Sequence, residues 1–146
     1  MDRFKEVFLC GLLALTIGIE VMIVLVSFFE LAAAGESSSP QALSNLINVA
    51  LLPIVPGMYA YPNRNLALAG VAVGFAGGLY MTLEYYAGNS HRYVEVVATL
   101  FAAVGWENIF FYLLLAAIVA FISTTFGWHI NYGLMSVAKR TEKDWP

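Results

Sequence analysis

The sequence predicts an all-α integral membrane protein with four transmembrane helices and a short interfacial or re-entrant helix before the fourth span. Composition is the first reason, because apolar residues make up 60% of the 146-residue chain and charged residues only 12%. Typical soluble proteins have about 45–50% and about 25%, and a small soluble domain cannot hide so much apolar surface from water. The second reason is that the few charged residues separate long uncharged segments of the length that a bilayer requires.

Four segments match the roughly 20 predominantly apolar residues that a membrane-spanning helix needs. They cover residues 7–31, 43–61, 66–86 and 107–128. The connecting loops are too short to fold separately, so residues 1–146 are expected to form a single transmembrane domain. A fifth apolar segment, residues 93–104, is too short to cross the bilayer and fits an interfacial or re-entrant helix better.

The boundaries of the first three segments carry recognisable signals. The first is longer than the roughly 7–15-residue apolar region of a signal peptide and contains Glu20, so we interpret it as a membrane span. Ser39-Pro40 is typical of a helix start and precedes the second segment. The turn-forming run Pro62-Asn63-Arg64-Asn65 separates the second segment from the third.

Trp106 and Trp128 delimit the fourth segment. They are 22 residues apart, or about 33 Å of helix, which matches a hydrocarbon core of about 30 Å. Tryptophan is enriched at both membrane interfaces, so this spacing agrees with a full crossing. Beyond the span, the sequence allows the helix to continue toward Ala138.

Basic residues are distributed unevenly between the two sides of the predicted bundle. With the N-terminus inside, Arg92 is the basic residue of the outer side. Because Lys and Arg concentrate in cytoplasmic loops, we expect both termini to be cytoplasmic, in a multi-pass protein of a prokaryotic plasma membrane. The basic residues of the inner side are Arg3, Lys5, Arg64, Lys139, Arg140 and Lys143.

Glu20 lies near the middle of the first span, where an ionisable group costs on the order of 3 kcal/mol on insertion scales. Thr16 and Ser27 lie within about 40° of it on a helical wheel, which gives a thin polar stripe. One interpretation is a cation or proton site. The other is a protonated carboxyl group that bonds a neighbouring helix, for instance through Asn45 or Asn48.

The second span combines those two asparagines with Pro53 and Pro56. Each proline removes an intrahelical hydrogen bond and clashes with the carbonyl group four residues earlier. A carbonyl group freed in a membrane must find another partner. The pattern fits a broken helix beside an ion site, as in many transporters, and it also fits a plain kink that shapes packing.

Glycines recur at every fourth position of the third span, at Gly70, Gly74 and Gly78. Small residues at this spacing let another helix approach closely, either within the chain or between subunits. Gly18 belongs to a weaker pattern of small residues in the first span. We interpret these glycines as helix-packing positions that carry no chemistry.

Several carboxylates gather on the predicted outer side, including Glu30 and Glu84 near the ends of their spans. They could attract cations to an entrance, or they could be ordinary interfacial residues. His91 and His129 fall on opposite sides of the membrane, so they cannot hold one metal ion together. The sequence contains no zinc spacing, phosphate-binding loop or nucleophile motif.

These observations predict a non-catalytic membrane subunit that packs into a larger assembly, without cofactor, metal or catalytic residues. The expected partners are the lipid bilayer and other membrane subunits or a second copy of the chain. Nucleic acid is excluded because seven Lys and Arg residues form no basic patch. The alternative is a small oligomeric cation or proton channel or carrier, and a membrane enzyme comes third. The channel would use Glu20, Thr16, Asn45 and Asn48 at its centre and Glu30 and Glu84 at its mouth.

Overall fold

The computed structural model describes residues 3–35, 39–60 and 63–143, in which helices are joined by short connections and no β-strand occurs. Four of its helical segments are long and apolar enough to cross a membrane, so the predictions of an all-helical fold and of four apolar segments of membrane-spanning length are confirmed. The elements are α1 (Arg3–Ala33), α2 (Pro40–Ala50), α3 (Ile54–Ala60), α4 (Arg64–Ala87), the short 3₁₀ helix η1 (Gly88–Ser90), α5 (Tyr93–Val104) and α6 (Trp106–Lys143).

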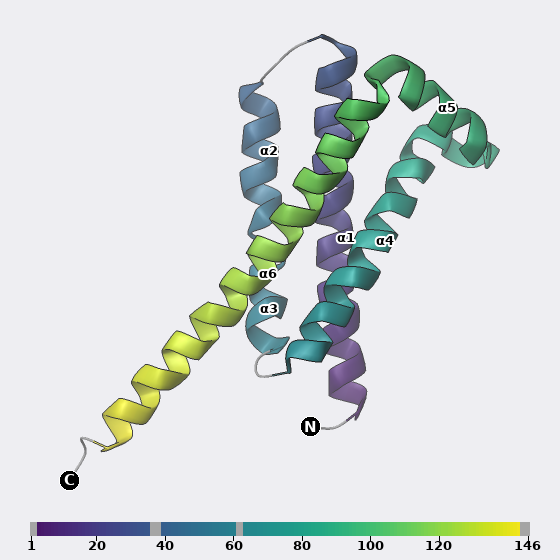
Figure 1. Ribbon diagram of the computed structural model, residues 1–146. Coiled ribbons are helices and arrows are strands. Elements are labelled where there is room, and N and C mark those ends of the chain that lie inside the picture. The colour runs from purple at the N-terminus through teal and green to yellow at the C-terminus, as the bar shows by residue number, and fades with distance from the viewer. Residues whose placement is uncertain (1–2, 36–38, 61–62, 144–146) are drawn as a thin grey trace.

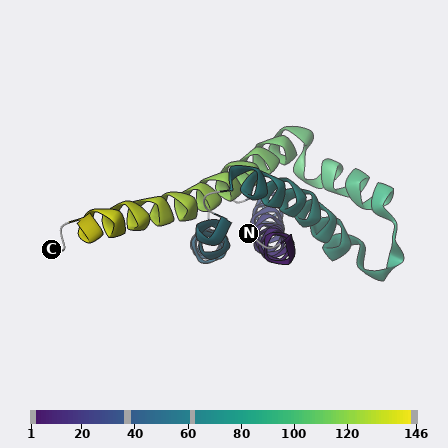
Figure 2. The same ribbon diagram turned by 90° about the horizontal axis from the view of Figure 1, so that it is seen from below.

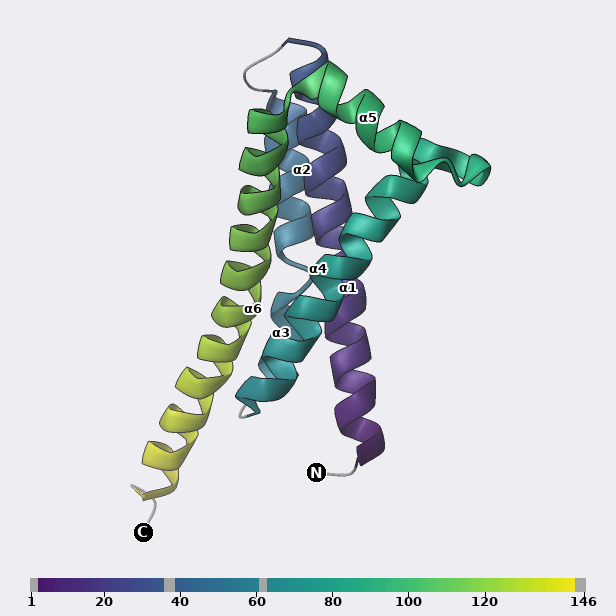
Figure 3. The ribbon, with the colours of Figure 1, turned by 45° about the vertical axis from the view of Figure 1, so that its right-hand side comes forward.

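The bundle spreads toward the end at which α1 begins and α6 finishes (Figure 1). In Figure 1 α6 passes diagonally in front of α1 and then separates from the other helices, and Figure 3 shows the same separation. Seen from below, the second half of α6 extends well beyond the rest of the bundle (Figure 2). The first turn of α1 and the last turns of α6 therefore lie at the same end of the molecule.

α1 and α4 run parallel and make the most extensive contact between helices of the bundle. The glycines of α4 face α1: a Cβ atom added at Gly74 would lie 2.5 Å from the Cβ of Ile17, and one added at Gly78 would lie 2.6 Å from the Cβ of Val21. No side chain fits at such distances. The missing side chains let the two backbones approach closely.

The approach is reciprocal at Gly18 of α1. A Cβ atom added there would lie 3.4 Å from the carbonyl oxygen of Gly74, and one added at Gly78 would lie 2.9 Å from the carbonyl oxygen of Gly18. At Gly70 the corresponding neighbour is Leu13, whose Cδ2 would be 2.6 Å away. The four glycines thus all lie at the contact between α1 and α4.

The second span is two helices, separated by residues 51–53. Pro53 has no amide hydrogen to offer the carbonyl group of Val49, and that group instead accepts a hydrogen bond from the amide of Leu52 at 3.0 Å. This bond joins residues three positions apart, as in a 3₁₀ helix, and it satisfies the carbonyl group of Val49 at the break. Pro56 lies in the first turn of α3, where a helix does not require an amide donor.

α3 packs directly on the backbone of α6. A Cβ atom added at Gly57 would lie 2.8 Å from the carbonyl oxygen of Thr124, and one added at Gly127 would overlap the carbonyl oxygen of Ile54. The side-chain amide of Asn131 donates to the carbonyl oxygen of Met58 at 2.6 Å. The short helix that follows the break is therefore held by α6 through backbone contact and a polar side chain.

α6 continues beyond Trp128, the end of the predicted fourth span, as the sequence allowed, and passes Ala138 to end at Lys143. No proline interrupts the sequence between Trp128 and Lys143, and Gly133 alone is tolerated within a helix. Thirty-eight residues extend about 57 Å, well beyond the hydrocarbon thickness of about 30 Å. The excess length requires a tilt or a projecting end.

α5 has the bounds expected from the sequence and runs sideways between the ends of α4 and α6 (Figure 1). Left-handed backbone conformations make the two corners. His91 has a φ of 53° and Gly105 a φ of 86°, and the latter is a conformation that glycine adopts without strain. The chain therefore reverses direction here without crossing the bundle.

The glycine contact predicts a sharp difference between two neighbouring substitutions. Gly74→Ala should lower the free energy of unfolding by about 1–3 kcal/mol, because its methyl group collides with Ile17 in a packed contact. Gly77→Ala is the matched control, since a Cβ atom there meets no atom within 4 Å. Reversible unfolding in mixed micelles measures both, and equal stability of the two variants would contradict the assignment.

Candidate functional site

Glu20 is completely buried between α1 and α6, where it meets Ser123. The hydroxyl oxygen of Ser123 lies 3.2 Å from each carboxyl oxygen of Glu20 and 3.1 Å from the carbonyl oxygen of Ala120. The two residues are 103 positions apart in the sequence. This pair is the polar centre of the bundle and the candidate site that the structure defines best.

The single hydroxyl hydrogen of Ser123 can serve one acceptor at a time. Either Ser123 donates to the carboxylate of Glu20, or a protonated Glu20 donates to Ser123 while Ser123 donates to Ala120. The second arrangement gives both hydroxyl hydrogens an acceptor and leaves no buried charge. Among the described residues, no basic side chain forms an ion pair with Glu20.

The walls of the site are apolar. The fully buried core residues that flank Glu20 along α1 include Ile17, Val21 and Val24, and Ala116 and Ala120 lie on α6. Thr124, next to Ser123, bonds back to the carbonyl oxygen of Ala120 at 2.9 Å and offers nothing to the glutamate. In this apolar setting the pair joins α1 to α6 through a buried polar contact.

Ser123 is the residue of this candidate site that the sequence analysis missed. The run Ser123-Thr124-Thr125 is the one cluster of hydroxyl side chains in the interior of the fourth span, and it was a visible signal for a polar contact there. The asparagines of the second span were the more obvious partners for Glu20, because a side-chain amide has more hydrogen-bond donors than a hydroxyl group. Only the rotation of α6 about its axis decides that Ser123 faces Glu20.

The other residues expected near Glu20 lie elsewhere. Thr16 donates to the carbonyl oxygen of Leu13 in its own helix at 2.9 Å. The side chain of Asn45 accepts a hydrogen bond from Gln41 at 3.1 Å, and Asn48 is exposed on the outside of the bundle. The structure therefore brings none of these three to Glu20.

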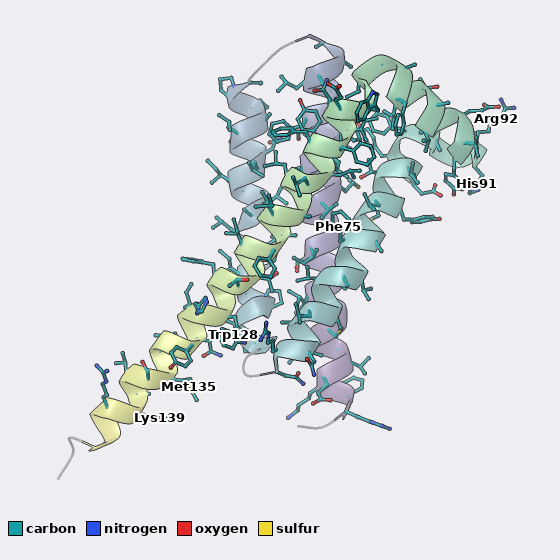
Figure 4. The ribbon with its side chains drawn as sticks, viewed as in Figure 1. Phe75, His91, Arg92, Trp128, Met135 and Lys139 are labelled. Carbon is teal, nitrogen blue, oxygen red and sulfur yellow. The ribbon has the colours of Figure 1, made fainter. Side chains whose placement is uncertain are left out.

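Glu30 and Glu84 lie near the C-terminal ends of α1 and α4 and belong to two separate contacts. Glu30 accepts a hydrogen bond from the hydroxyl of Tyr85 at 3.2 Å. Glu84 accepts one from Tyr93 of α5, whose hydroxyl also lies 3.0 Å from the Nδ1 atom of His91. Donation to Glu84 raises the pKa of Tyr93 above its usual range. Figure 4 shows His91 and Arg92 at the tip of this corner.

The described residues contain no group of three or more His, Cys, Asp or Glu side chains that could hold a metal ion. Glu84 and His91 approach within 3.8 Å, and the pair connects the end of α4 to the loop before α5. The contact of Glu30 with Tyr85 connects α1 to α4, and the contact of Glu84 with Tyr93 connects α4 to α5. Comparison with protein-family models, with curated proteins and with solved structures finds no match.

A double-mutant cycle tests the contact between Glu20 and Ser123. Combining Glu20→Ala with Ser123→Ala should reveal a coupling of about 0.6–1.7 kcal/mol in the free energy of unfolding, as polar contacts between membrane helices do. Ser136 is the matched control, because it lies on the same helix and makes the same kind of bond to its own backbone, to Gly133 at 2.9 Å. The cycle of Glu20→Ala with Ser136→Ala should give no coupling, and equal coupling in both cycles would refute the contact.

Proposed function

We propose that this chain is a non-catalytic subunit of a larger membrane protein assembly, and that a partner helix docks on the polar face of α2. The observation that carries the proposal is Asn48. Its side chain is exposed near the middle of the span Pro40–Tyr59 and makes no hydrogen bond with another residue that the structure describes. Hydrocarbon offers an amide no partner, so an amide left there is costly.

Asn48 shares its face of α2 with Gln41 and Ser44, which are exposed as well. Residues spaced three, four and seven apart lie on one side of a helix, so the three form a continuous polar stripe on the outside of the bundle. Amide and hydroxyl side chains are the groups that hydrogen-bond between membrane helices. A second membrane helix with polar side chains fits this stripe better than lipid does.

The interior of the bundle supports a structural role. Among the residues that the structure describes, the buried polar ones are Glu20, Thr82, Ser123 and Thr124, and each takes part in a hydrogen bond inside the bundle. These bonds connect helices or cap a helix's own carbonyl groups, as structural contacts do. Asn48, in contrast, faces outward and has no hydrogen-bond partner among the described residues, which is a pattern expected of a subunit.

We also propose that the end with the first turn of α1 faces the cytoplasm and that α5 lies at the opposite membrane interface. The basic side chains of Arg3, Lys5, Arg64, Lys139 and Arg140 support this orientation through the positive-inside rule. α5 is apolar but has only 12 residues, too few to cross the hydrocarbon core. A prokaryotic plasma membrane is the proposed location.

The alternative function is a small oligomeric channel or carrier for protons or cations, centred on Glu20. It would need water to reach a side chain that is 0% exposed and is engaged by Ser123. Flux of protons or cations into proteoliposomes that contain the purified chain tests it. A flux that Glu20→Gln abolishes would favour the channel over the subunit. A membrane enzyme stays the third possibility, as ranked from the sequence.

Substitution of Asn48 tests the docking face. Asn48→Leu should weaken the complex that co-purifies with the tagged chain by about threefold to thirtyfold, the range expected for loss of one polar contact between membrane helices. Asn48→Gln, which keeps the amide, should retain the partner. Quantitative mass spectrometry of the material extracted in a mild detergent measures the retained fraction.

Leu43→Ala provides the control for this test, since Leu43 is 52% exposed on a different side of α2. It should leave co-purification unchanged. Partner retention by Asn48→Leu equal to that of the unsubstituted chain would contradict the proposed face. Isolation of the chain as a stable monomer with no associated polypeptide would contradict the proposed function itself.

A further inference from the structure

A cavity of about 310 Å³ lies between the first turns of α4 and the middle of α6. It is separate from the contact between Glu20 and Ser123 and from the polar face of α2. Figure 4 places Trp128, one of its lining residues, where α6 begins to separate from the other helices. The spreading of the bundle at this end therefore leaves a recess between two membrane helices.

The recess has two chemically different parts. Its walls are apolar and come from both helices, with Leu68 and Val71 on α4 and Phe121 on α6. Arg64 and His129 lie on its rim, and Thr125 adds a hydroxyl group. An occupant that fits both parts has a hydrocarbon chain and an anionic head.

Arg64 strengthens the case for an anion. Its side chain is exposed and forms no ion pair with any acidic residue that the structure describes. Arg92, at the other end of the bundle, is by contrast paired with Glu95 at 3.5 Å. The hydroxyl of Thr125 likewise makes no hydrogen bond with another described residue, so a cation and a donor are both available at the recess.

The wall residues also indicate where the occupant comes from. Leu68 is 47% exposed and Phe121 is 54% exposed, and both belong to helices that can span the membrane. The recess therefore opens onto the surface that lipid covers. Arg64 begins α4, which places the positive charge near the end of the span, at the depth of lipid headgroups.

We propose that this recess binds one anionic phospholipid. An acyl chain packs against Leu68, Val71 and Phe121, and the headgroup phosphate is held by Arg64, with Thr125 as a hydrogen-bond donor. Basic pockets between membrane helices recognise anionic headgroups in this way. A lipid bound in this recess would connect α4 to α6 at the end of the bundle where the helices spread apart.

Photolabelling in membranes that contain the full chain, with any partners in place, tests the site. The probes are phosphatidylglycerol and phosphatidylcholine with the same diazirine-bearing acyl chain, and the labelled residues are mapped by mass spectrometry. Residues 67–71 and 121–125 should be labelled about fivefold more strongly by phosphatidylglycerol, the gain expected from one basic side chain near the membrane surface. Equal labelling by the two lipids would overturn the proposal.

Two arginine variants make a matched pair. Arg64→Gln should reduce labelling by phosphatidylglycerol to the level of phosphatidylcholine, whereas Arg92→Gln should leave the fivefold preference intact. A preference that survives Arg64→Gln would overturn the assignment of the headgroup site. Ala67→Phe, which fills the recess, should remove labelling there by both lipids and spare the rest of the chain, and undiminished labelling would refute the location of the acyl chain.

A diazirine-bearing fatty acid separates the two sources of an anionic amphiphile. It should label the recess less strongly than phosphatidylglycerol does, because a carboxylate lacks the glycerophosphate group that reaches both Arg64 and Thr125. Labelling by the fatty acid as strong as that by phosphatidylglycerol would overturn the assignment to a phospholipid.

Discussion

The close contact of α1 with α4 is the constraint on which the rest of the bundle depends. In a membrane, apolar side chains gain little by leaving lipid for protein, so helices associate through close packing and polar contacts. The glycines of α4 allow a backbone approach that no larger residue permits, with Ile17 seated against Gly74. Once α1 is fixed in this groove, its neighbouring side, which carries Glu20, is fixed toward α6.

The contact between Glu20 and Ser123 then determines how α6 is rotated over its first half. Alanines at positions 116 and 120 are fully buried there, so α6 also approaches closely. Beyond Ser123, the contact with α3 takes over through Gly57 and Gly127. Beyond the hydrogen bond from Asn131 to Met58, α6 extends away from the other helices, and Met135 and Lys139 lie on this projecting part (Figure 4).

The polar groups of the described residues fall into two sets, one inside the bundle and one on its surface. Inside, Glu20, Thr82, Ser123 and Thr124 bond one another or their own backbone, which stabilises the bundle, while the buried hydroxyl of Tyr86 has no hydrogen-bond partner among the described residues. Asn48 and Arg64 face outward on different helices, and each lacks a partner among the residues that the structure describes. These two groups are the basis of the proposed contacts, with another membrane helix at α2 and with a lipid at α4 and α6.

The sequence by itself determined the number of apolar spans, the short fifth segment and the break near Pro53, because hydrocarbon thickness and proline chemistry act on local sequence. It also singled out Glu20, since a charge in the middle of a span is visible without a structure. Only the tertiary structure decided that Ser123 is its partner and that Asn48 faces away. The physical reason is that lipid-facing and protein-facing sides of a membrane helix are both apolar. Periodicity therefore does not reveal the rotation of each helix, and contacts 103 residues apart follow only from packing.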